Sequence, residues 1–158
     1  MSEIKLLALD LDGTLFTKDK QVTAENRVAL KAAEAKGVHV VITTGRPLPA
    51  ITHILEDLDL LDDKHYSVTF NGGLVQRNNG DILIKKEMSR EDLKQIYAVF
   101  QPLGLPMDVI SDGIVYGVPS KGNHSLYRQA NPALTFVDVE SIDDIPENIV
   151  YNKVVTVC

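Results

Sequence analysis

The order of segments in the N-terminal half constrains the fold more than any other feature of this chain. Residues 4–9 form a nearly continuous apolar run, and strand-like segments follow at 38–44 and 66–70. Helical patterns at 23–37 and 47–58 separate these three segments. Because parallel strands need a crossover connection, usually a helix, the alternation predicts an α/β sheet built from right-handed βαβ units.

Capping residues mark the limits of the expected helices. Thr23 is a candidate N-cap for the first helix, Gly37 suits its C-terminal end, and Pro47 stands near the start of the second. Further along the chain, Ser89 and Asp92 have the spacing of a capping box, followed by apolar residues at helical intervals. We therefore expect a third helix over residues 89–100.

The pattern changes in the second half, where short strands gather around tight turns. Asn79-Gly80 and Asp112-Gly113 each lie between strand-like runs, which is a strong hairpin signal. A weaker helix and two more strand-like runs follow, at 123–130, 134–139 and 148–157. We therefore expect an α+β region and place the domain boundary near residue 82, giving domains 1–82 and 83–158.

Composition and charge exclude several classes of partner. The chain has 158 residues, 44% of them hydrophobic and 24% charged, as in ordinary globular domains. The net charge of -6, without a cluster of Lys and Arg, argues against nucleic acid or an anionic membrane as a partner. Cys158 is the only cysteine, so no internal disulfide is expected. With neither a signal peptide nor a membrane-length apolar run, we expect a cytoplasmic protein.

Two carboxylates follow the first buried strand directly. In "KLLALDLDGTLF", Asp10 and Asp12 are two residues apart, so in an extended segment both project to the same side. They then lie at the carboxyl end of a strand, where open α/β sheets bind ligands. One can act as a nucleophile and the other as an acid/base if a cation offsets their repulsion. The structural alternative is a turn or helix cap, which explains a single Asp followed by Gly.

The hexapeptide DLDGTL resembles the first motif of the haloacid dehalogenase-like (HAD) hydrolase superfamily. The resemblance implies that Asp10 attacks phosphorus and that Asp12 protonates the leaving oxygen and then activates water. It also implies that Asp10 and Asp12 hold Mg²⁺, the only cofactor expected. The backbone at Gly13 and Thr14 would cradle phosphate. The implied fold is the N-terminal part of a Rossmann-like HAD core, with an incomplete α+β class II cap.

Two further segments extend the resemblance. "VVITTGRP" is similar to the second motif, which assigns phosphate binding to Thr44 and Gly45, with Thr43 as the other register and Arg46 as a bidentate contact. "TFNGGLVQ" looks like a segment of the Cof-type, class IIB, sugar-phosphatase-like branch, which assigns substrate contact to Asn71. A capping Thr or an Asn-Gly turn would explain either segment alone.

Two later motifs of the family have no counterpart in these 158 residues. One is a Lys that neutralises nucleophile and phosphate, and the other is a Gly-Asp-x-x-Asn-Asp stretch that completes the Mg²⁺ site. The chain therefore reads as C-terminally truncated, and we expect it to be inactive or nearly so by itself. In the family sheet the strand bearing Asp10 is central, so here it would be an exposed apolar edge. We expect homodimerisation or strand exchange through it.

The function that this reasoning favours is Mg²⁺-dependent hydrolysis of small phosphorylated metabolites, such as sugar phosphates, through an aspartyl-phosphate. Two other classes stay open. One is a phospho-binding module, since signalling receiver domains also carry acids at a strand end. The other is a degenerate, non-catalytic interaction protein. A phosphomutase uses the same first motif and is only disfavoured. The sequence does not identify the substrate.

Overall fold

The chain folds into two compact units, residues 1–85 and 86–158. The structure is a computed structural model that describes residues 3–157, so the prediction about Cys158 lies outside the described residues. The expected boundary at residue 82 is displaced to residue 85. Strand β5 (Ile82–Lys85) pairs antiparallel with β4 (Leu74–Arg77), which keeps both strands of the Asn79-Gly80 hairpin in the first unit.

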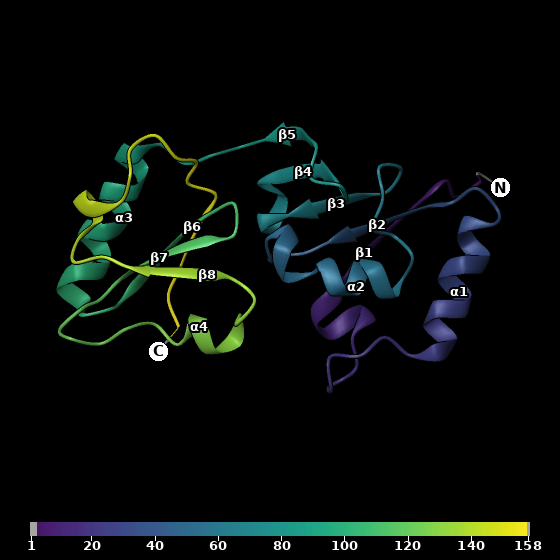
Figure 1. Cartoon of the computed structure of the whole chain (residues 1–158), viewed down its shortest axis with the longest axis horizontal. Helices are drawn as coiled ribbons and strands as arrows, with labels where there is room; N and C mark the ends of the chain where they lie inside the picture. The colour runs from purple at the N-terminus through teal and green to yellow at the C-terminus, as the bar shows by residue number, and fades with distance from the viewer. Residues whose placement is uncertain (1–2, 158) are drawn as a thin grey trace. The chain divides into compact units, whose positions relative to one another are not determined.

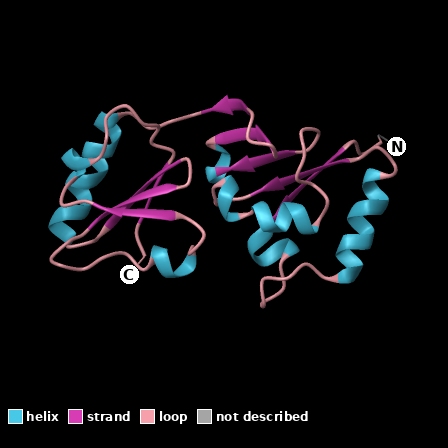
Figure 2. Cartoon of the chain, in the orientation of Figure 1, coloured by secondary structure: helices cyan, strands magenta, loops and turns pink. Residues whose placement is uncertain are grey.

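The first unit is built on a five-stranded sheet in the order β1-β2-β3-β4-β5 (Figures 1 and 2). Strands β1 (Leu6–Asp10), β2 (His39–Thr43) and β3 (Tyr66–Thr69) run parallel to one another, and β4 and β5 continue antiparallel. The expected α/β class is confirmed.

Two helices accompany this sheet. Helix α1 (Ala24–Glu34) begins after Thr23, whose hydroxyl accepts a hydrogen bond from the Asn26 amide at 3.2 Å, as the capping pattern predicts. The single helix expected at 47–58 is wrong. A short 3₁₀ turn, Leu48–Ala50, precedes helix α2 (Thr52–Asp57), and the non-helical φ of −122° at Ile51 separates them.

The core of the first unit lies on one face of the sheet. Val40 and Ile42 of β2 pack with Leu30 of α1 and with Ile54 and Leu55 of α2. The opposite face presents a shallow hollow lined by Leu6, Ala8, His39, Val41, Thr43, Tyr66, Val68 and Val75. Strand β1 is at the edge of the sheet, and its Leu6 side chain is 56% exposed. The sheet therefore has an apolar edge, as expected from the sequence.

The second unit is built on a four-stranded sheet in the order β8-β7-β6-β9. Its strands are β6 (Met107–Ser111), β7 (Ile114–Val118), β8 (Thr135–Asp138) and β9 (Lys153–Val155). The β6–β7 hairpin is antiparallel, β9 adds to β6 antiparallel, and β8 pairs parallel with β7. This mixed sheet with separate helices is the expected α+β arrangement.

Helix α3 (Arg90–Leu103) covers one face of this sheet through Leu93, which packs with Met107 and Val109 of β6. The predicted capping box is present, since the Ser89 hydroxyl accepts from the Asp92 amide and the Asp92 carboxylate accepts from the Ser89 amide. The helix expected over 123–130 shortens to α4 (Tyr127–Ala130).

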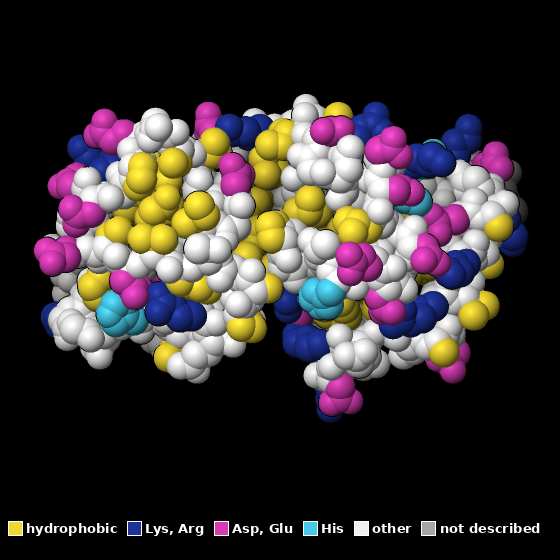
Figure 3. Space-filling model, viewed as in Figure 1, with side chains coloured by type: hydrophobic (Ala, Val, Ile, Leu, Met, Phe, Trp, Pro, Cys, Tyr) yellow, Lys and Arg dark blue, Asp and Glu magenta, His cyan; other side chains and the backbone are white. Residues whose placement is uncertain are grey.

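Acidic and basic side chains are interspersed on the face that Figure 3 shows, rather than gathered by sign. This agrees with the absence of a Lys and Arg cluster in the sequence. Within residues 3–157, no helix combines the length and the apolar character needed to cross a membrane.

Candidate active site

The turn that follows β1 presents the first motif. Leu11 and Leu15 are buried and anchor the segment Leu11–Leu15, while Asp12 and Gly13 between them are exposed. Gly13 has a φ of +85°, a conformation that side chains with a Cβ adopt only at a cost. The glycine of the motif therefore reverses the chain directly after the two carboxylates.

The loops after β2 and β3 are tied together by main-chain hydrogen bonds. The Thr44 amide donates to the Val68 carbonyl at 2.8 Å, and the Asn71 amide donates to the Thr44 carbonyl at 3.2 Å. Phe70, Asn71 and Gly72 all have positive φ, which for non-glycine residues is uncommon and costs about 1–3 kcal/mol each. This sharp reversal turns the Asn71 loop back toward Thr44.

These three strand ends form one open pocket of about 550 Å³. Its lining consists of Asp10, Thr43, Thr44, Gly45, Val68, Asn71 and Gly72. Asp10 lies directly opposite Thr43 in the register of β1 and β2. The predicted residues Asp10, Thr44, Gly45 and Asn71 thus meet in one place, and Thr43, the other register, lines the same pocket.

Asp12 is held by two cations instead of lining that pocket. The Arg46 guanidinium binds its carboxylate in a bidentate manner, with Nε 3.0 Å from Oδ2 and Nη2 3.0 Å from Oδ1. The Lys20 ammonium also contacts Oδ1. The hydrogen bond from Arg46 holds the pKa of Asp12 below its ordinary value; partial burial opposes this effect and Lys20 adds to it. Asp12 is therefore stabilised as a carboxylate.

This arrangement changes what the predicted residues do in the structure. Arg46, expected as a bidentate contact to phosphate, here makes its bidentate contact with Asp12. Gly13 and Thr14 are exposed in the turn and do not line the pocket. Lys20 was missed by the sequence reasoning. Its position depends on the tight turn of residues 17–21, in which Lys20 has a φ of +57°, and nothing in the sequence distinguishes it from Lys18.

The described residues could supply two oxygen ligands to a divalent cation such as Mg²⁺. Asp10 supplies an exposed carboxylate, and the Asp12 carbonyl is a second oxygen. Within residues 3–157, no three acidic, His or Cys side chains are grouped so that they could hold a metal. A hexacoordinate ion would therefore take its remaining ligands from water, phosphate or other groups. Thr44 adds a hydroxyl that is 6% exposed and accepts from the Arg46 amide at 3.2 Å, leaving its proton to donate.

The geometry describes an α/β protein with an exposed carboxylate at the end of its first strand, and the comparisons with known proteins identify the family. The haloacid dehalogenase-like hydrolase family matches residues 7–158, so the chain belongs to that family. The family and fold expected from the sequence are confirmed.

Two similar curated proteins carry provisional phosphatase names. M6_Spy0533 of Streptococcus pyogenes is 34% identical over 96% of this chain and 55% of its own length. YxeH of Bacillus subtilis is 30% identical over 95% of this chain and 56% of its own length. The chain therefore spans about half the length of these relatives.

Solved structures share the fold. A haloacid dehalogenase-like hydrolase from Bacteroides thetaiotaomicron superposes with a TM-score of 0.75 at 20% identity, covering 93% of this chain and 56% of its own. The subclass IIB sugar phosphatase BT4131 superposes with a TM-score of 0.73 at 23% identity. The match covers 92% of this chain and 56% of that structure's chain. At this level of identity the likeness shows the fold alone.

Proposed function

We propose that this chain carries the nucleophile-bearing part of a Mg²⁺-dependent phosphatase for small phosphorylated metabolites such as sugar phosphates. The observation that carries the proposal is the open pocket where Asp10 meets Thr43, Thr44, Gly45 and Asn71. An exposed carboxylate facing hydroxyl and amide donors suits in-line attack on a phosphoryl group. The membership of the haloacid dehalogenase-like family supports the same reaction class.

The reaction would proceed in two displacements. An oxygen of Asp10 attacks phosphorus, the bond to the leaving oxygen breaks, and that oxygen takes a proton from Asp12. Water then attacks the phosphorus of the aspartyl-phosphate, passes a proton to Asp12, and releases phosphate with regeneration of the Asp10 carboxylate. Mg²⁺ held by the Asp10 carboxylate and the Asp12 carbonyl would offset the charge of the phosphoryl group. Thr44 would donate its hydroxyl proton to a phosphoryl oxygen.

The contacts around Asp12 set a condition on this mechanism. Arg46 and Lys20 favour the ionised form of Asp12, whereas a general acid must carry a proton. Asp12 can act as an acid only after exchanging these cations for the substrate. The freed Arg46 and Lys20 could then face the phosphate.

The substrate class rests on the names of similar proteins. YcsE of Bacillus subtilis, 35% identical over 60% of this chain, is named a 5-amino-6-(5-phospho-D-ribitylamino)uracil phosphatase. BT4131, similar in fold, is named a sugar phosphatase. Both names denote phosphatases, and the uracil compound carries its phosphate on a polyol chain. We infer a phosphomonoester on a small polyol or sugar as the substrate.

We further propose that the 158-residue chain alone turns over little or no substrate. Within residues 3–157, no three acidic, His or Cys side chains are grouped so that they could complete a Mg²⁺ site. Loss of one such electrostatic element typically costs about 10²–10³ in rate. Activity close to background is the expected result when phosphate release is measured with Mg²⁺ and a panel of sugar phosphates.

Covalent labelling tests the chemistry without requiring turnover. The chain is incubated with acetyl phosphate and Mg²⁺, and phosphorylation is followed by intact mass and mapped by peptide analysis. We expect slow labelling at Asp10 that Asp10→Asn removes. Equal labelling of the Asp10→Asn variant would contradict the assignment of the nucleophile. Phosphate release abolished by Asp10→Asn would support the reaction but refute the inactivity of the chain.

A further inference from the structure

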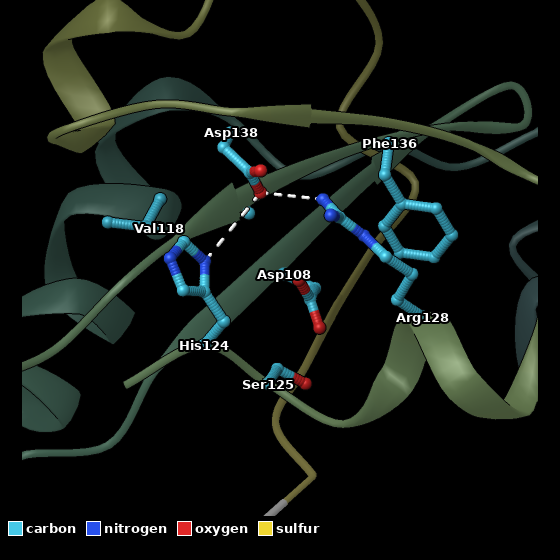
Figure 4. A pocket seen from close by; sticks show the side chains of 8 residues that line it. Asp108, Val118, His124, Ser125, Arg128, Phe136 and Asp138 are labelled. Carbon is cyan, nitrogen blue, oxygen red and sulfur yellow. Dashed lines mark hydrogen bonds and ion pairs between the residues drawn. The ribbon is translucent and has the colours of Figure 1, made fainter. Parts of the chain in front are cut away.

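A second polar pocket lies wholly within the second unit, on the side of the β6–β7–β8 sheet to which Asp108 points. Figure 4 shows His124 and Arg128 reaching Asp138, with Asp108 and Ser125 beneath them. The lining consists of Asp108, Gly117, Val118, His124, Ser125, Arg128, Phe136 and Asp138. None of these residues takes part in the phosphatase chemistry proposed above.

Asp108 is a buried carboxylic acid with one oxygen left over. The residue is only 4% exposed, and its Oδ2 has no hydrogen-bond partner among the described residues. Burial raises the pKa of its carboxyl group above the ordinary value, although a hydrogen bond with Ser125 and the charge of Arg128 oppose this. An unpaired acceptor at this depth costs about 1–3 kcal/mol. Asp108 Oδ2 therefore lacks a hydrogen-bond donor in this pocket.

Arg128 and Ser125, two residues of the pocket with donor groups, make contacts other than with Asp108 Oδ2. Arg128 Nη2 lies 2.6 Å from Asp138 Oδ1, and its guanidinium stacks 4.9 Å from the centre of the Phe136 ring. Ser125 Oγ accepts from the amides of Tyr127 and Val157, each at 3.2 Å, and this hydroxyl lowers the pKa of Asp108 against the larger effect of burial. No donor of the described residues is hydrogen-bonded to Asp108 Oδ2, so a ligand that completes the pocket must bring its own donor.

The charged groups that line the pocket indicate whether the donor of the ligand is cationic, neutral or anionic. The pocket holds two carboxyl groups, Asp108 and Asp138, and one guanidinium, Arg128, while His124 Nδ1 lies 3.6 Å from Asp138 Oδ1. Arg128 pairs with Asp138, and Asp108 is left without a cation at contact distance among the described residues. An anion would meet both carboxylates, so the pocket excludes phosphate and selects a cation or a neutral donor.

The size of the pocket and the positions of its carboxyl oxygens narrow the choice of ligand. The interior admits only about one water-sized group. A Cβ built on Gly117 would lie 3.1 Å from Asp138 Oδ1 and 3.4 Å from Asp108 Oδ1, so an alanine at this position would crowd both carboxyl groups. No grouping of three acidic, His or Cys side chains suited to a metal occurs in the described chain. We propose that this pocket binds the terminal primary ammonium group of a small ligand, with Asp108 as its counter-ion.

The test titrates the isotope-labelled chain with methylammonium chloride and follows amide chemical shifts by NMR. Saturable shifts are expected at the amides of Gly117 and Ser125, beyond those caused by equal concentrations of KCl. Methanol, a neutral donor of the same size, should not reproduce them. If KCl or methanol produces the same saturable shifts, the assignment of an ammonium ligand is overturned. The absence of any saturable shift overturns the site itself.

Three variants separate a specific site from a general charge effect. Asp108→Asn keeps the shape of the side chain and removes the charge, and it should weaken binding roughly 10- to 100-fold, the effect of losing one charged hydrogen bond. Gly117→Ala keeps Asp108 but fills the space between the two carboxylates, and it should abolish binding. Asp112→Asn removes one exposed charge from the same hairpin and should bind like the parent.

The two pocket variants also guard the test against a folding defect. If Asp108→Asn does not give the dispersed spectrum of the parent, Gly117→Ala, whose φ is not in the left-handed region, decides the outcome alone. Unchanged methylammonium binding in a folded Asp108→Asn or Gly117→Ala protein would overturn the proposal. If Asp112→Asn also loses methylammonium binding, the net charge of the chain and not the pocket attracts the probe. That result would overturn the proposal too.

Discussion

Asp12 in the first unit and Asp108 in the second are surrounded by opposite electrostatic environments. Asp12 is exposed in a turn, where Arg46 and Lys20 bind its carboxylate and lower its pKa. Asp108 is buried in a strand, where its Oδ2 has no partner among the described residues and burial raises its pKa. These two residues show that aspartates in one chain can have pKa values shifted in opposite directions by their surroundings. Asp12 has cations before any ligand arrives, while Asp108 lacks one.

The largest expected effect concerns the pocket beside Asp12, where Thr44 can donate to phosphate. Thr44→Val removes the hydroxyl, which also accepts the Arg46 amide at 3.2 Å. We expect labelling of Asp10 by acetyl phosphate to slow by about 10²–10³, the usual loss for one preorganised donor. The measurement is the labelling rate followed by intact mass.

Thr44→Ser is the matched control for this substitution, because it keeps the hydroxyl and loses only a methyl group. It should label at nearly the parent rate. If Thr44→Val also labels at the parent rate, the hydroxyl does not bind the phosphoryl group. Thr43, in the alternative register, would then be the residue to replace.

The edges of the two sheets extend the comparison to association between chains. Edge strand β1 exposes Leu6 at 56%, whereas edge strand β8 carries Asp138 and exposes Val137 at 40%. An apolar edge pairs readily with another chain, and a charged one does not. We expect the 158-residue chain to dimerise through β1, and Leu6→Lys to weaken the dimer about tenfold or more, the effect of losing one buried Leu.

Val137→Lys adds the same charge to the other edge and should leave the association unchanged. Sedimentation velocity over a range of concentrations measures both variants against the parent. A parent that is monomeric at every concentration would contradict the prediction. Equal weakening by Leu6→Lys and Val137→Lys would show that net charge, not strand β1, controls the association.

The pocket lined by Asp10 could be predicted from the sequence better than the contacts around it, for a physical reason. Asp10 ends β1, Thr44 directly follows β2 and Asn71 lies just beyond β3, and the carboxyl ends of parallel strands meet at one edge. Alternation of strands and helices is a local signal, so this meeting point could be predicted. The contact of Lys20 with Asp12 depends on a positive φ in a turn, which no periodicity records.

The Asp108 pocket could not be predicted from the sequence, for a different reason. Asp108 is the one charged residue in β6, a strand whose sequence predicts burial, and its neighbours Arg128 and Asp138 come from later segments. Their approach depends on β8 pairing with β7, a parallel pairing across the intervening α4 segment. Such a contact is tertiary, and the local pattern offered no sign of it.

Removing Arg46 sharpens the contrast between the two aspartates. Arg46→Ala takes away the main cause of the lowered pKa at Asp12, so this pKa should rise toward its ordinary value of 3.8. Carbon-13 NMR of the side-chain carboxyl group over an acid titration measures the change. Arg27→Ala is the control, because its ion pair with Asp57 is elsewhere in the same unit. An unchanged pKa of Asp12 in Arg46→Ala would show that Lys20 suffices.

The smallest expected effect is on stability, where the two aspartates should differ in sign. The folded pKa of Asp108 is above 3.8, so its stabilising contribution is present below that pH and is lost as pH rises through the folded pKa. Asp108→Asn removes the group whose ionisation destabilises the folded chain as pH rises. At neutral pH it should therefore raise the free energy of unfolding by about 1 kcal/mol, because burying an amide destabilises the folded state less than burying a carboxylate.

Asp12 should behave in the opposite way, since its folded pKa is below 3.8. Its contribution is present above that pH and is lost as pH falls through the folded pKa, so Asp12→Asn should destabilise the chain at neutral pH and hardly at all in acid. The effect should be smaller than that at Asp108, because solvent screens this exposed ion pair. Urea unfolding of both variants at several pH values measures the two slopes. Slopes of the same sign would mean that burial, not the presence or absence of cations, dominates at both sites.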